Sequence, residues 1–430
     1  MHKVLKFGVL GARRGSALAR GARANGVEIT ALCDQQEEMA SLTAAQLGNG
    51  CKAFFDFAEM LKTDIDAVMI ANYATEHLWA VKMALAAGKH VMSECMACFT
   101  MAEAVELVEA VERSGCIYML AENYPFFVQN LEMKRLYETG EFGKFVYGEG
   151  EYVHPITAHD MVRLSNGPEH WRNWFSPLYY CTHSMGPIMN ITGTRPVSVN
   201  GFVFPYDDQD SEQTMSLRRG DQGGVLMCRM ADEAIVKLLP WSSLRDHGQR
   251  YRICCNKGTL EWNQGDPRLR VHVEPFDKPE SPTHNQWYTP NFPSEHQEAL
   301  KHGHGGGDYF TSYYFCEAIR TGKQPFQDVY RAVDMTVIGI QGYRSALNNN
   351  NTYEIPDFHD PAARDQYRHD DWNHDPKRRQ PGMPFGSIRG NITPSPEALA
   401  FFQKEKEIHE QEIRKELETL RRQSKGRREK

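Results

Sequence analysis

Residues 4–34, VLKFGVLGARRGSALARGARANGVEITALCD, set the architecture of the N-terminal part of this chain. A short apolar run, Val4–Leu10, leads into a glycine-containing turn and then into the helix-like segment Ala17–Ala24. A second apolar run, Val27–Cys33, ends directly before Asp34. This order of strand, helix and strand is typical of a parallel sheet that is covered by helices.

The same alternation continues to about residue 122. Ala67–Ala71 reads as a strand, and a helix follows it through Ala84. His90–Met92 and Ile117–Ala121 are further strand candidates, separated by the strongly helical run MAEAVELVEAVERSG. The sequence therefore predicts an α/β protein whose residues 1–123 form a doubly wound parallel sheet of the Rossmann type.

The pattern changes after about residue 145, where short strand-like segments recur with turn signals between them. Such a pattern predicts a large, mainly antiparallel open sheet within a second α/β domain at 124–358. Two amphipathic helices near its end are expected to pack back on the first domain, and residues 359–430 to form an extended, charged tail. The expected strands are Val146–Val153, Val197–Phe204, Thr214–Arg218, Gly224–Arg229, Ile235–Leu239, Tyr251–Cys254, Thr259–Trp262 and Leu269–Val273, and the helices are Tyr309–Arg320 and Val329–Leu347.

Bulk composition excludes several classes of partner. The 430 residues are 41% hydrophobic and 24% charged with a net charge of −7, so neither nucleic acid nor an anionic membrane is expected as a partner. No apolar run is long enough to span a bilayer, and the N-terminus lacks signal-peptide features, which predicts a cytoplasmic location. The ten cysteines lie mostly in apolar segments, so we expect reduced core thiols. The isolated pair Cys95-x-x-Cys98 has no matching second pair, and no metal site is predicted from it.

The turn after the first strand has the features of a phosphate-binding loop. Glycines at this position let the backbone approach a pyrophosphate that rests on the helix N-terminus. The loop is one residue shorter than the usual G-x-G-x-x-G, and Arg13 stands where the middle glycine would lie. Asp34 follows the second strand at the distance expected of a carboxylate that binds the adenosine ribose, and it would repel a 2′-phosphate. We therefore predict NAD rather than NADP, bound by Gly11, Arg13, Arg14, Gly15 and Asp34.

Three longer segments resemble the Gfo/Idh/MocA oxidoreductases: DAVMIANYATEHLWAVKMALAAGKHV, AENYPFF and GEFGKFVYGEGEY. The resemblance implies a Rossmann domain followed by an α/β domain with an open sheet. It also implies a sugar or cyclitol substrate held between these domains, over the nicotinamide. On this resemblance we expect Asn72, His77, Glu94 and Asn123 to contribute to the cofactor site.

The chain departs from the dehydrogenases of that family at two motifs. Those enzymes carry E-K-P after the fifth strand, with a lysine that assists removal of the hydroxyl proton, and D-x-x-x-H in the second domain. Here the first motif reads Glu94-Cys95-Met96, and the second keeps only His183. A thiol at position 95 brings no positive charge to lower the pKa of an alcohol, so the usual proton relay is missing.

Further segments are similar to the NAD-dependent glycosidases of family 109 within the same superfamily. These segments are YYCTHSMGP, HWRN and HGGGDYF. The resemblance implies catalytic roles for Glu122, Tyr152, Arg172, Tyr180 and His183, and substrate contacts by Trp171, Tyr179, His304 and Asp308.

The interpretation favoured by the sequence is a hydrolase that oxidises C3 of a glycoside, eliminates the aglycone, adds water and reduces C3 again. NAD would then stay bound and be recycled, with His183 as the base for the C3 hydroxyl. Two alternatives stay open, a sugar 3-dehydrogenase and a non-catalytic NAD-binding protein. The sugar, its anomer, the aglycone and the C2 base are open as well, and we expect a homo-oligomer, either a dimer or a tetramer.

Overall fold

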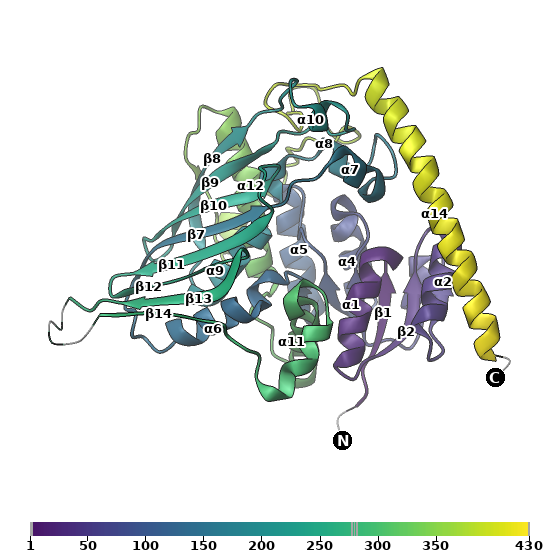
Figure 1. Cartoon of the computed structure of the whole chain (residues 1–430), viewed down its shortest axis with the longest axis horizontal. Helices are drawn as coiled ribbons and strands as arrows, with labels where there is room; N and C mark the ends of the chain where they lie inside the picture. The colour runs from purple at the N-terminus through teal and green to yellow at the C-terminus, as the bar shows by residue number, and fades with distance from the viewer. Residues whose placement is uncertain (1–2, 277, 279, 281–282, 429–430) are drawn as a thin grey trace. The chain divides into compact units, whose positions relative to one another are not determined.

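The computed structural model of the chain describes residues 3–276, 278, 280 and 283–428 (Figure 1). It divides into two compact units. The first comprises Met1–His154, Pro177–Val203 and Gly223–Trp372, and the second comprises Pro155–Ser176, Phe204–Gln222 and Asn373–Lys430. None of the helices in the described residues has the length and apolarity needed to cross a membrane.

The N-terminal sheet of the first unit has six parallel strands in the order β3-β2-β1-β4-β5-β6, which confirms the predicted doubly wound fold. Its central strands are buried along nearly their whole length, as expected of strands with helices on both faces. The strands are β1 Lys6–Leu10, β2 Glu28–Cys33, β3 Lys52–Phe54, β4 Ala67–Ile70, β5 His90–Ser93 and β6 Tyr118–Leu120. The helices are α1 Ala12–Ala24, α2 Glu37–Leu47, α3 Phe57–Leu61, α4 His77–Ala86 and α5 Met101–Ser114.

The second sheet has nine strands in the order β14-β13-β12-β11-β7-β10-β9-β8-β15, and it is mainly antiparallel, as predicted. Among the strand pairs whose register is defined, β7 with β10 is the parallel exception. The strands are β7 Phe145–Val153, β8 Pro196–Phe204, β9 Gly223–Met230, β10 Ile235–Ser242, β11 Gly248–Cys255, β12 Gly258–Asn263, β13 Asp266–Val273, β14 His284–Tyr288 and β15 Tyr353–Glu354.

One strand prediction is wrong. Thr214–Arg218 was expected to be a strand, but the chain forms the short helix α10, Ser211–Thr214, and then turns. Asp210 caps this helix, because its carboxylate accepts the Glu212 backbone N–H at 2.9 Å. Strand β14 was not predicted, since it is a short edge strand whose residues are largely exposed.

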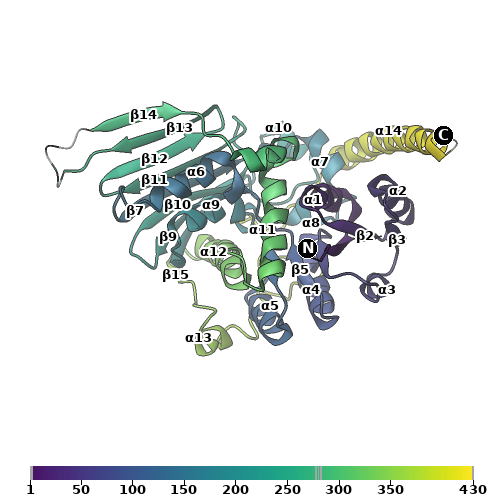
Figure 2. The same ribbon diagram turned by 90° about the horizontal axis from the view of Figure 1, so that it is seen from below.

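Helices cover one face of the nine-stranded sheet and also join it to the Rossmann core. Helix α9, Thr182–Thr192, packs against β7, and α12, Val329–Leu347, packs against α5. Helix α11, Gly307–Thr321, lies beside α1 in both ribbon views (Figures 1 and 2), and the Phe315 ring is 5.5 Å from that of Phe7 in β1. The remaining elements of this unit are the helices α6 Val128–Tyr137 and α13 Pro361–Asp365, together with the 3-10 turns η1 Ala74–Glu76, η2 Tyr124–Phe126, η3 Pro177–Tyr179, η4 Ser294–Lys301 and η5 His304–Gly306.

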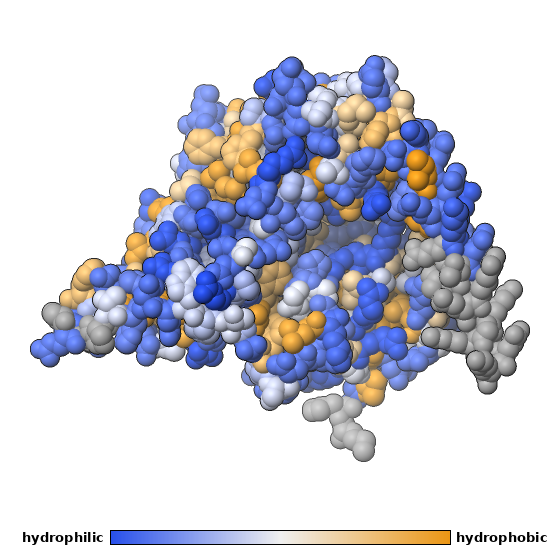
Figure 3. All heavy atoms as spheres, in the orientation of Figure 1, coloured by the Kyte–Doolittle hydropathy of each residue, from blue (hydrophilic) through white to orange (hydrophobic). Residues whose placement is uncertain are grey.

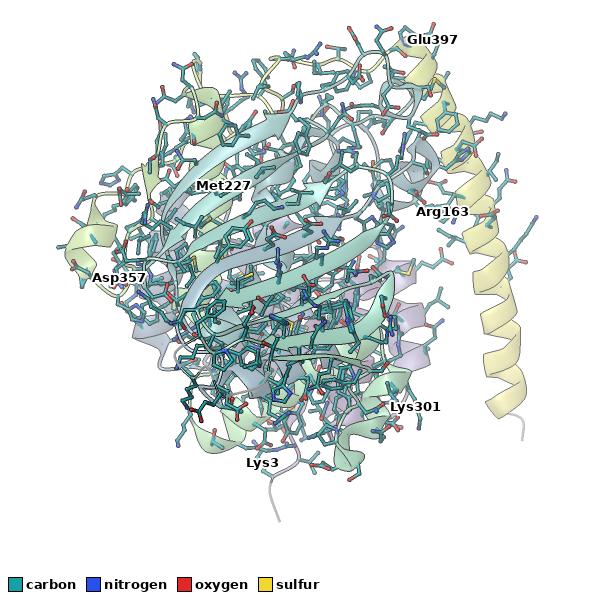
Figure 4. All side chains as sticks on the ribbon, turned by 60° about the vertical axis from the view of Figure 1, so that its left-hand side comes forward. Lys3, Arg163, Met227, Lys301, Asp357 and Glu397 are labelled. Atoms are coloured by element: carbon teal, nitrogen blue, oxygen red, sulfur yellow. The ribbon has the colours of Figure 1, made fainter. Side chains whose placement is uncertain are left out.

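The other face of the nine-stranded sheet carries charged side chains rather than a continuous apolar surface. Figure 4 looks onto the sheet, with Met227 of β9 labelled. Lys237 lies 3.5 Å from Glu149 and 3.7 Å from Glu151, and Glu261 pairs with Arg252 at 3.3 Å and with Arg270 at 2.8 Å. On the face drawn in Figure 3, apolar residues are likewise interspersed with hydrophilic ones. Assembly into a dimer or tetramer stays a prediction.

The second unit combines short helices with one long helix, and both apolar and polar side chains are buried in it. Its helices are α7 Ala158–Leu164, α8 Trp171–Trp174, α10 and α14 Pro396–Arg428, so much of the charged tail is helical. Phe402 of α14 packs with Val162 and Leu217. His374 is fully buried and its Nε2 accepts the Ser176 backbone N–H at 3.0 Å. The domain boundaries predicted at 123 and 358 stay a prediction, because each compact unit is made of several separate stretches of the chain.

Candidate active site

The central pair of the site is Glu122 and His183. Glu122 follows β6 and is fully buried, whereas His183 lies in the first turn of α9 and keeps a small exposed fraction of 8%. The imidazole Nδ1 lies 2.8 Å from each carboxylate oxygen of Glu122. Because an ionised carboxylate can only accept, Nδ1 carries the proton of this hydrogen bond. In the neutral imidazole, Nε2 is then the atom that can accept a proton from a substrate.

Three tyrosine rings surround the His183 imidazole. Tyr124 stacks on it with ring centroids 4.1 Å apart and an interplanar angle of 20°. Tyr152 and Tyr180 meet it edge-on, at 4.8 and 5.1 Å. Tyr152 comes from the end of β7 and Tyr180 from the segment between η3 and α9, so two predicted catalytic tyrosines and the predicted histidine converge in the fold. We call Tyr124, Tyr152, Tyr180 and His183 the aromatic box.

Cys95 also contacts the Glu122 carboxylate. Its thiol donates to Glu122 Oε2 at 3.2 Å, and the Tyr124 backbone N–H donates to Oε1 at 3.1 Å. Burial raises the pKa of the Cys95 thiol, and the nearby Glu122 and Glu94 charges raise it further, so the thiol stays neutral. Burial would also raise the pKa of Glu122, but the charge and hydrogen bond of His183 outweigh it, and this pKa lies below its usual value.

A second cluster lies next to the aromatic box and is centred on the buried Asp308. Arg14 donates to both Asp308 oxygens at 2.9 and 2.8 Å, and its Nε donates to Glu94 at 2.6 Å. Asn123 donates to Asp308 at 3.0 Å, and His304 Nδ1 lies 3.1 Å from the same carboxylate. We call Arg14, Glu94, Asn123, His304 and Asp308 the arginine hub.

The arginine hub explains the HGGGD motif in structural terms. His304, Gly305 and Gly306 all have positive φ, which turns the chain back over the start of α11 and brings His304 onto Asp308. Although burial opposes it, hydrogen bonds and charges from His304 and Arg14 hold the pKa of Asp308 well below its usual range. The ring of His304 lies 6.2 Å from that of Tyr124, so the hub adjoins the aromatic box.

The loop between β1 and α1 fits a dinucleotide phosphate. Gly11 has φ 96°, and a Cβ there would lie 2.4 Å from the Ala71 carbonyl oxygen, so only glycine fits. The N-cap residue of α1 is Gly11, which has no side chain to cap the helix or to block the approach of an anion to its first turn. Asp34 accepts the Ala12 N–H at 2.8 Å and the Gln36 N–H at 2.9 Å, each with one oxygen, and each oxygen keeps a lone pair for a ribose hydroxyl.

Two amide oxygens also favour a dinucleotide site at this edge of the sheet. The buried Oδ1 atoms of Asn72 and Asn123 have no hydrogen-bond partner among the described residues. Both residues follow strands, β4 and β6, at the carboxyl edge of the sheet where dinucleotides bind. Two of the residues predicted to hold NAD thus offer unpartnered acceptor oxygens at the expected edge.

Other residues named from the sequence lie outside these clusters. His77 is buried between the carbonyls of Met96 and Asn72, at 2.8 and 3.3 Å, and burial lowers its pKa, so it ties two loops together beside Asn72. Tyr179 is fully buried and its ring packs 5.3 Å from Phe99, a position that favours packing over substrate contact. Arg172 and Trp171 belong to the second unit, where the guanidinium lies 4.4 Å from the indole ring. Their predicted roles at the site stay predictions.

Sequence reasoning missed Tyr124 and its hydrogen-bond partner. The Tyr124 ring covers one face of His183, and Gln249 of β11 reaches its hydroxyl at 3.5 Å. Tyr251, also on β11, donates to the His183 carbonyl at 2.6 Å. The AENYPFF segment contains Tyr124 directly after Glu122 and Asn123, and this adjacency was the one available signal.

Comparison with known proteins agrees with the fold. Residues 5–122 match the oxidoreductase family with the NAD-binding Rossmann fold, Gfo/Idh/MocA, and residues 207–363 match the C-terminal domain of glycosyl hydrolase 109. A glycosyl hydrolase family 109 protein of Streptomyces niveus is 26% identical over 397 residues, covering 81% of this chain and 76% of that protein. Glycosyl hydrolase family 109 protein 1 of Bacteroides thetaiotaomicron is 25% identical, covering 81% of this chain and 83% of its own.

Solved structures share the fold at lower identity. Levoglucosan dehydrogenase in complex with NADH and L-sorbose superposes with a TM-score of 0.69 at 18% identity, covering 83% of this chain and all of that one. An NAD-binding oxidoreductase from Klebsiella pneumoniae gives 0.67 at 17%, covering 82% and 99%. The chain therefore has an NAD-binding Rossmann domain of the Gfo/Idh/MocA type, and its similarities support an enzyme that is either an NAD-dependent glycosidase or a sugar oxidoreductase. Residues 207–363 are similar to the C-terminal domain of glycosyl hydrolase family 109.

Proposed function

We propose that this protein is an NAD-dependent glycoside hydrolase that oxidises, eliminates, hydrates and reduces its substrate within one turnover. The observation that carries the proposal is the Glu122–His183 pair, which stands beside a neutral Cys95 thiol where dehydrogenases of similar sequence place a lysine. A base remains in the site, but the fixed positive charge does not.

His183 acts on the C3 hydroxyl of the sugar. Nε2 accepts the hydroxyl proton while the C3 hydride leaves, and the resulting imidazolium is stabilised by the buried Glu122 carboxylate 2.8 Å from Nδ1. A bound NAD would supply the acceptor for this hydride and the donor for its return to C3 at the end of the turnover. Gly11, Asp34, Asn72 and Asn123 are the residues that would hold it.

The two edge-on tyrosines serve the elimination step. Oxidation at C3 acidifies the C2 hydrogen, so a base can remove it as the C1–O bond to the aglycone breaks. Tyr152 and Tyr180 present phenols around the imidazole and would hydrogen-bond the developing enolate oxygen. Water then adds at C1 and a proton returns to C2. His183 finally returns its proton to O3.

A stoichiometry experiment tests the proposal. The purified protein is denatured to measure released NAD or NADH, and the native protein is incubated with a panel of nitrophenyl glycosides. The expected result is release of nitrophenol over many turnovers, without net NADH and without added NAD. NADH that accumulates one-for-one with oxidised sugar would instead make the protein a 3-dehydrogenase, and an absence of turnover on every glycoside would favour a non-catalytic NAD-binding protein.

A further inference from the structure

We propose that Cys95, Glu122 and His183 form a binding site for a thiophilic divalent cation, with Zn²⁺ as the expected ion, and that this ion switches off the His183 base. Each residue offers one ligand atom, and the three atoms lie within 4.8 Å of one another. All three residues are buried. Binding of the ion is independent of the proposed function, whereas the inhibition rests on it.

The spacing of the three ligand atoms is close to that of a tetrahedral site. With Zn–N and Zn–O bonds of about 2.0–2.2 Å and a Zn–S bond of about 2.3 Å, tetrahedral geometry separates N from O by about 3.4 Å and S from O by about 3.5 Å. The structure has 2.8 Å from His183 Nδ1 to Glu122 and 3.2 Å from the Cys95 sulfur to Glu122. These two separations therefore have to widen by only about half an ångström, the sulfur and Nδ1 already lie within 4.8 Å of each other, and one coordination position stays open.

The ligand chemistry selects the class of ion. Thiolate and imidazole favour zinc and its neighbours, whereas Mg²⁺ and Ca²⁺ prefer sites made of oxygen ligands alone. A lysine at position 95 would repel a cation, but the cysteine present in this chain supplies a ligand. The cluster uses Cys95 without Cys98, so the site was not visible in the Cys-x-x-Cys spacing.

The ligands are already held in place by their neighbours. Glu122 Oε1 accepts the Tyr124 N–H, Tyr251 donates to the His183 carbonyl, and the Tyr124 ring stacks on the imidazole. Contacts of this kind orient metal ligands and raise affinity. Cys95 and His183 retain exposed fractions of 7% and 8%, while Glu122 has none, so an ion would enter past the thiol and the imidazole.

Binding changes the protonation of His183. The thiol loses its proton to solvent as the sulfur–metal bond forms, and the ion takes the Nδ1 lone pair. The single proton of the neutral imidazole then resides on Nε2, which can no longer accept the proton of the C3 hydroxyl. One proton is released for each ion bound, so affinity increases as pH rises.

Cobalt spectroscopy on the purified full-length protein tests the site directly. Co²⁺ is the probe, because a thiolate ligand gives a near-ultraviolet charge-transfer band and tetrahedral geometry gives intense visible bands. We expect both bands for the wild type, their loss on addition of Zn²⁺, and Co²⁺ binding weakened more than about tenfold in Cys95→Ser and in Glu122→Gln. Cys98→Ser is the matched control, since Cys98 is equally buried in the same segment but outside the cluster, and it should keep the bands.

The outcomes separate this proposal from the proposed function. Absence of the charge-transfer band in the wild type, or a band that persists unchanged in Cys95→Ser with circular dichroism showing both proteins folded, would overturn the metal site. If the protein hydrolyses glycosides, Zn²⁺ should inhibit it reversibly, a chelator should restore activity, and Cys95→Ser should need more than about ten times as much Zn²⁺ relative to its own uninhibited rate. A protein without glycosidase activity that still shows the cobalt bands refutes the function alone.

Discussion

Two buried carboxylates stand close together in this protein and are neutralised in different ways. Asp308 is held by the Arg14 guanidinium through two hydrogen bonds, with further contacts from Asn123 and His304. Glu122 is held by His183, by the Cys95 thiol and by one backbone N–H. The partner of Asp308 is a guanidinium with a fixed charge, whereas the partner of Glu122 is an imidazole, whose second nitrogen can take part in proton transfer.

This difference indicates different roles for the arginine hub and the aromatic box. Arg14 comes from α1 and Asp308 from α11, so their ion pair fastens α11 to the Rossmann core. Burial lowers the pKa of the Arg14 guanidinium, but the charges and hydrogen bonds of Glu94 and Asp308 outweigh it and raise this pKa above its usual value. His183 has one nitrogen engaged and the other available. We therefore expect the arginine hub to govern stability and the aromatic box to govern turnover.

The largest expected effect concerns His183→Ala. Removal of the general base should lower glycoside turnover by about a thousandfold, while the amount of NAD bound to the folded protein stays close to wild type. The urea midpoint should also fall, because the variant leaves the Glu122 carboxylate buried without its partner. The measurement is nitrophenol release under saturating substrate, with NAD released by denaturation as the second readout. His284→Ala removes an exposed imidazole from the edge strand β14 and serves as the control. Unchanged turnover in His183→Ala would refute the assignment of the base.

The second expected effect concerns Asp308→Asn, which keeps the shape of the side chain but removes its charge. Breaking a buried pair by removing one partner should cost about 3 kcal/mol in the free energy of unfolding, measured by urea titration. The kcat of the folded fraction should change only a few-fold. The double variant Arg14→Met/Asp308→Leu should be less destabilised than the sum of its single variants. A raised KM with unchanged stability would instead support the substrate contact predicted for Asp308 from its motif.

Much of the fold was predictable because its signals are local. The alternation of apolar runs and helices in residues 4–122 determined the Rossmann sheet, and strands such as Tyr251–Cys254 follow from their own turn signals. The error at Thr214–Arg218 arose where a capping residue, Asp210, outweighed strand-like residues.

The site was predictable only as a set of residues. Glu122 and His183 were named from motifs, but their contact joins residues 61 positions apart, and Arg14 and Asp308 are 294 apart. No local pattern encodes such pairings. The same holds for Cys95, whose role depends on the carboxylate that the fold brings to it.

A third buried group, His374 in the second unit, extends the comparison to an imidazole whose pKa is set by burial. Burial lowers its pKa from 6.5 to about 3, so the folded protein keeps it neutral while the unfolded chain binds a proton below pH 6.5. Stability from this group is therefore complete above about pH 6.5 and falls by up to about 1.4 kcal/mol per pH unit toward pH 3.

The variant His374→Gln checks this pH dependence. Its amide oxygen can still accept the Ser176 N–H, but it cannot titrate. Urea titrations between pH 4 and pH 7 should show that the unfolding free energy of the variant depends less steeply on pH than that of wild type. The difference in slope should correspond to close to one proton fewer taken up on unfolding. Trp174, whose ring is 5.7 Å from that of His374, provides a nearby fluorescence signal. Equal slopes for the two proteins would show that His374 is protonated equally in the folded and unfolded states.

The smallest expected effect concerns the hydroxyl of Tyr124, which separates the stacking role of that ring from any proton transfer. Tyr124→Phe keeps the ring on the imidazole and removes only a hydroxyl that Gln249 reaches at 3.5 Å, so kcat/KM should fall by no more than about threefold. Tyr124→Leu removes the stacked ring, and an aromatic contact of about 0.5–1.5 kcal/mol corresponds to a loss of up to about tenfold. Steady-state kinetics of both variants across pH makes the distinction. If Tyr124→Phe lost as much activity as Tyr124→Leu, the hydroxyl of Tyr124 would itself take part in proton transfer, and the ring would not act only by stacking on His183.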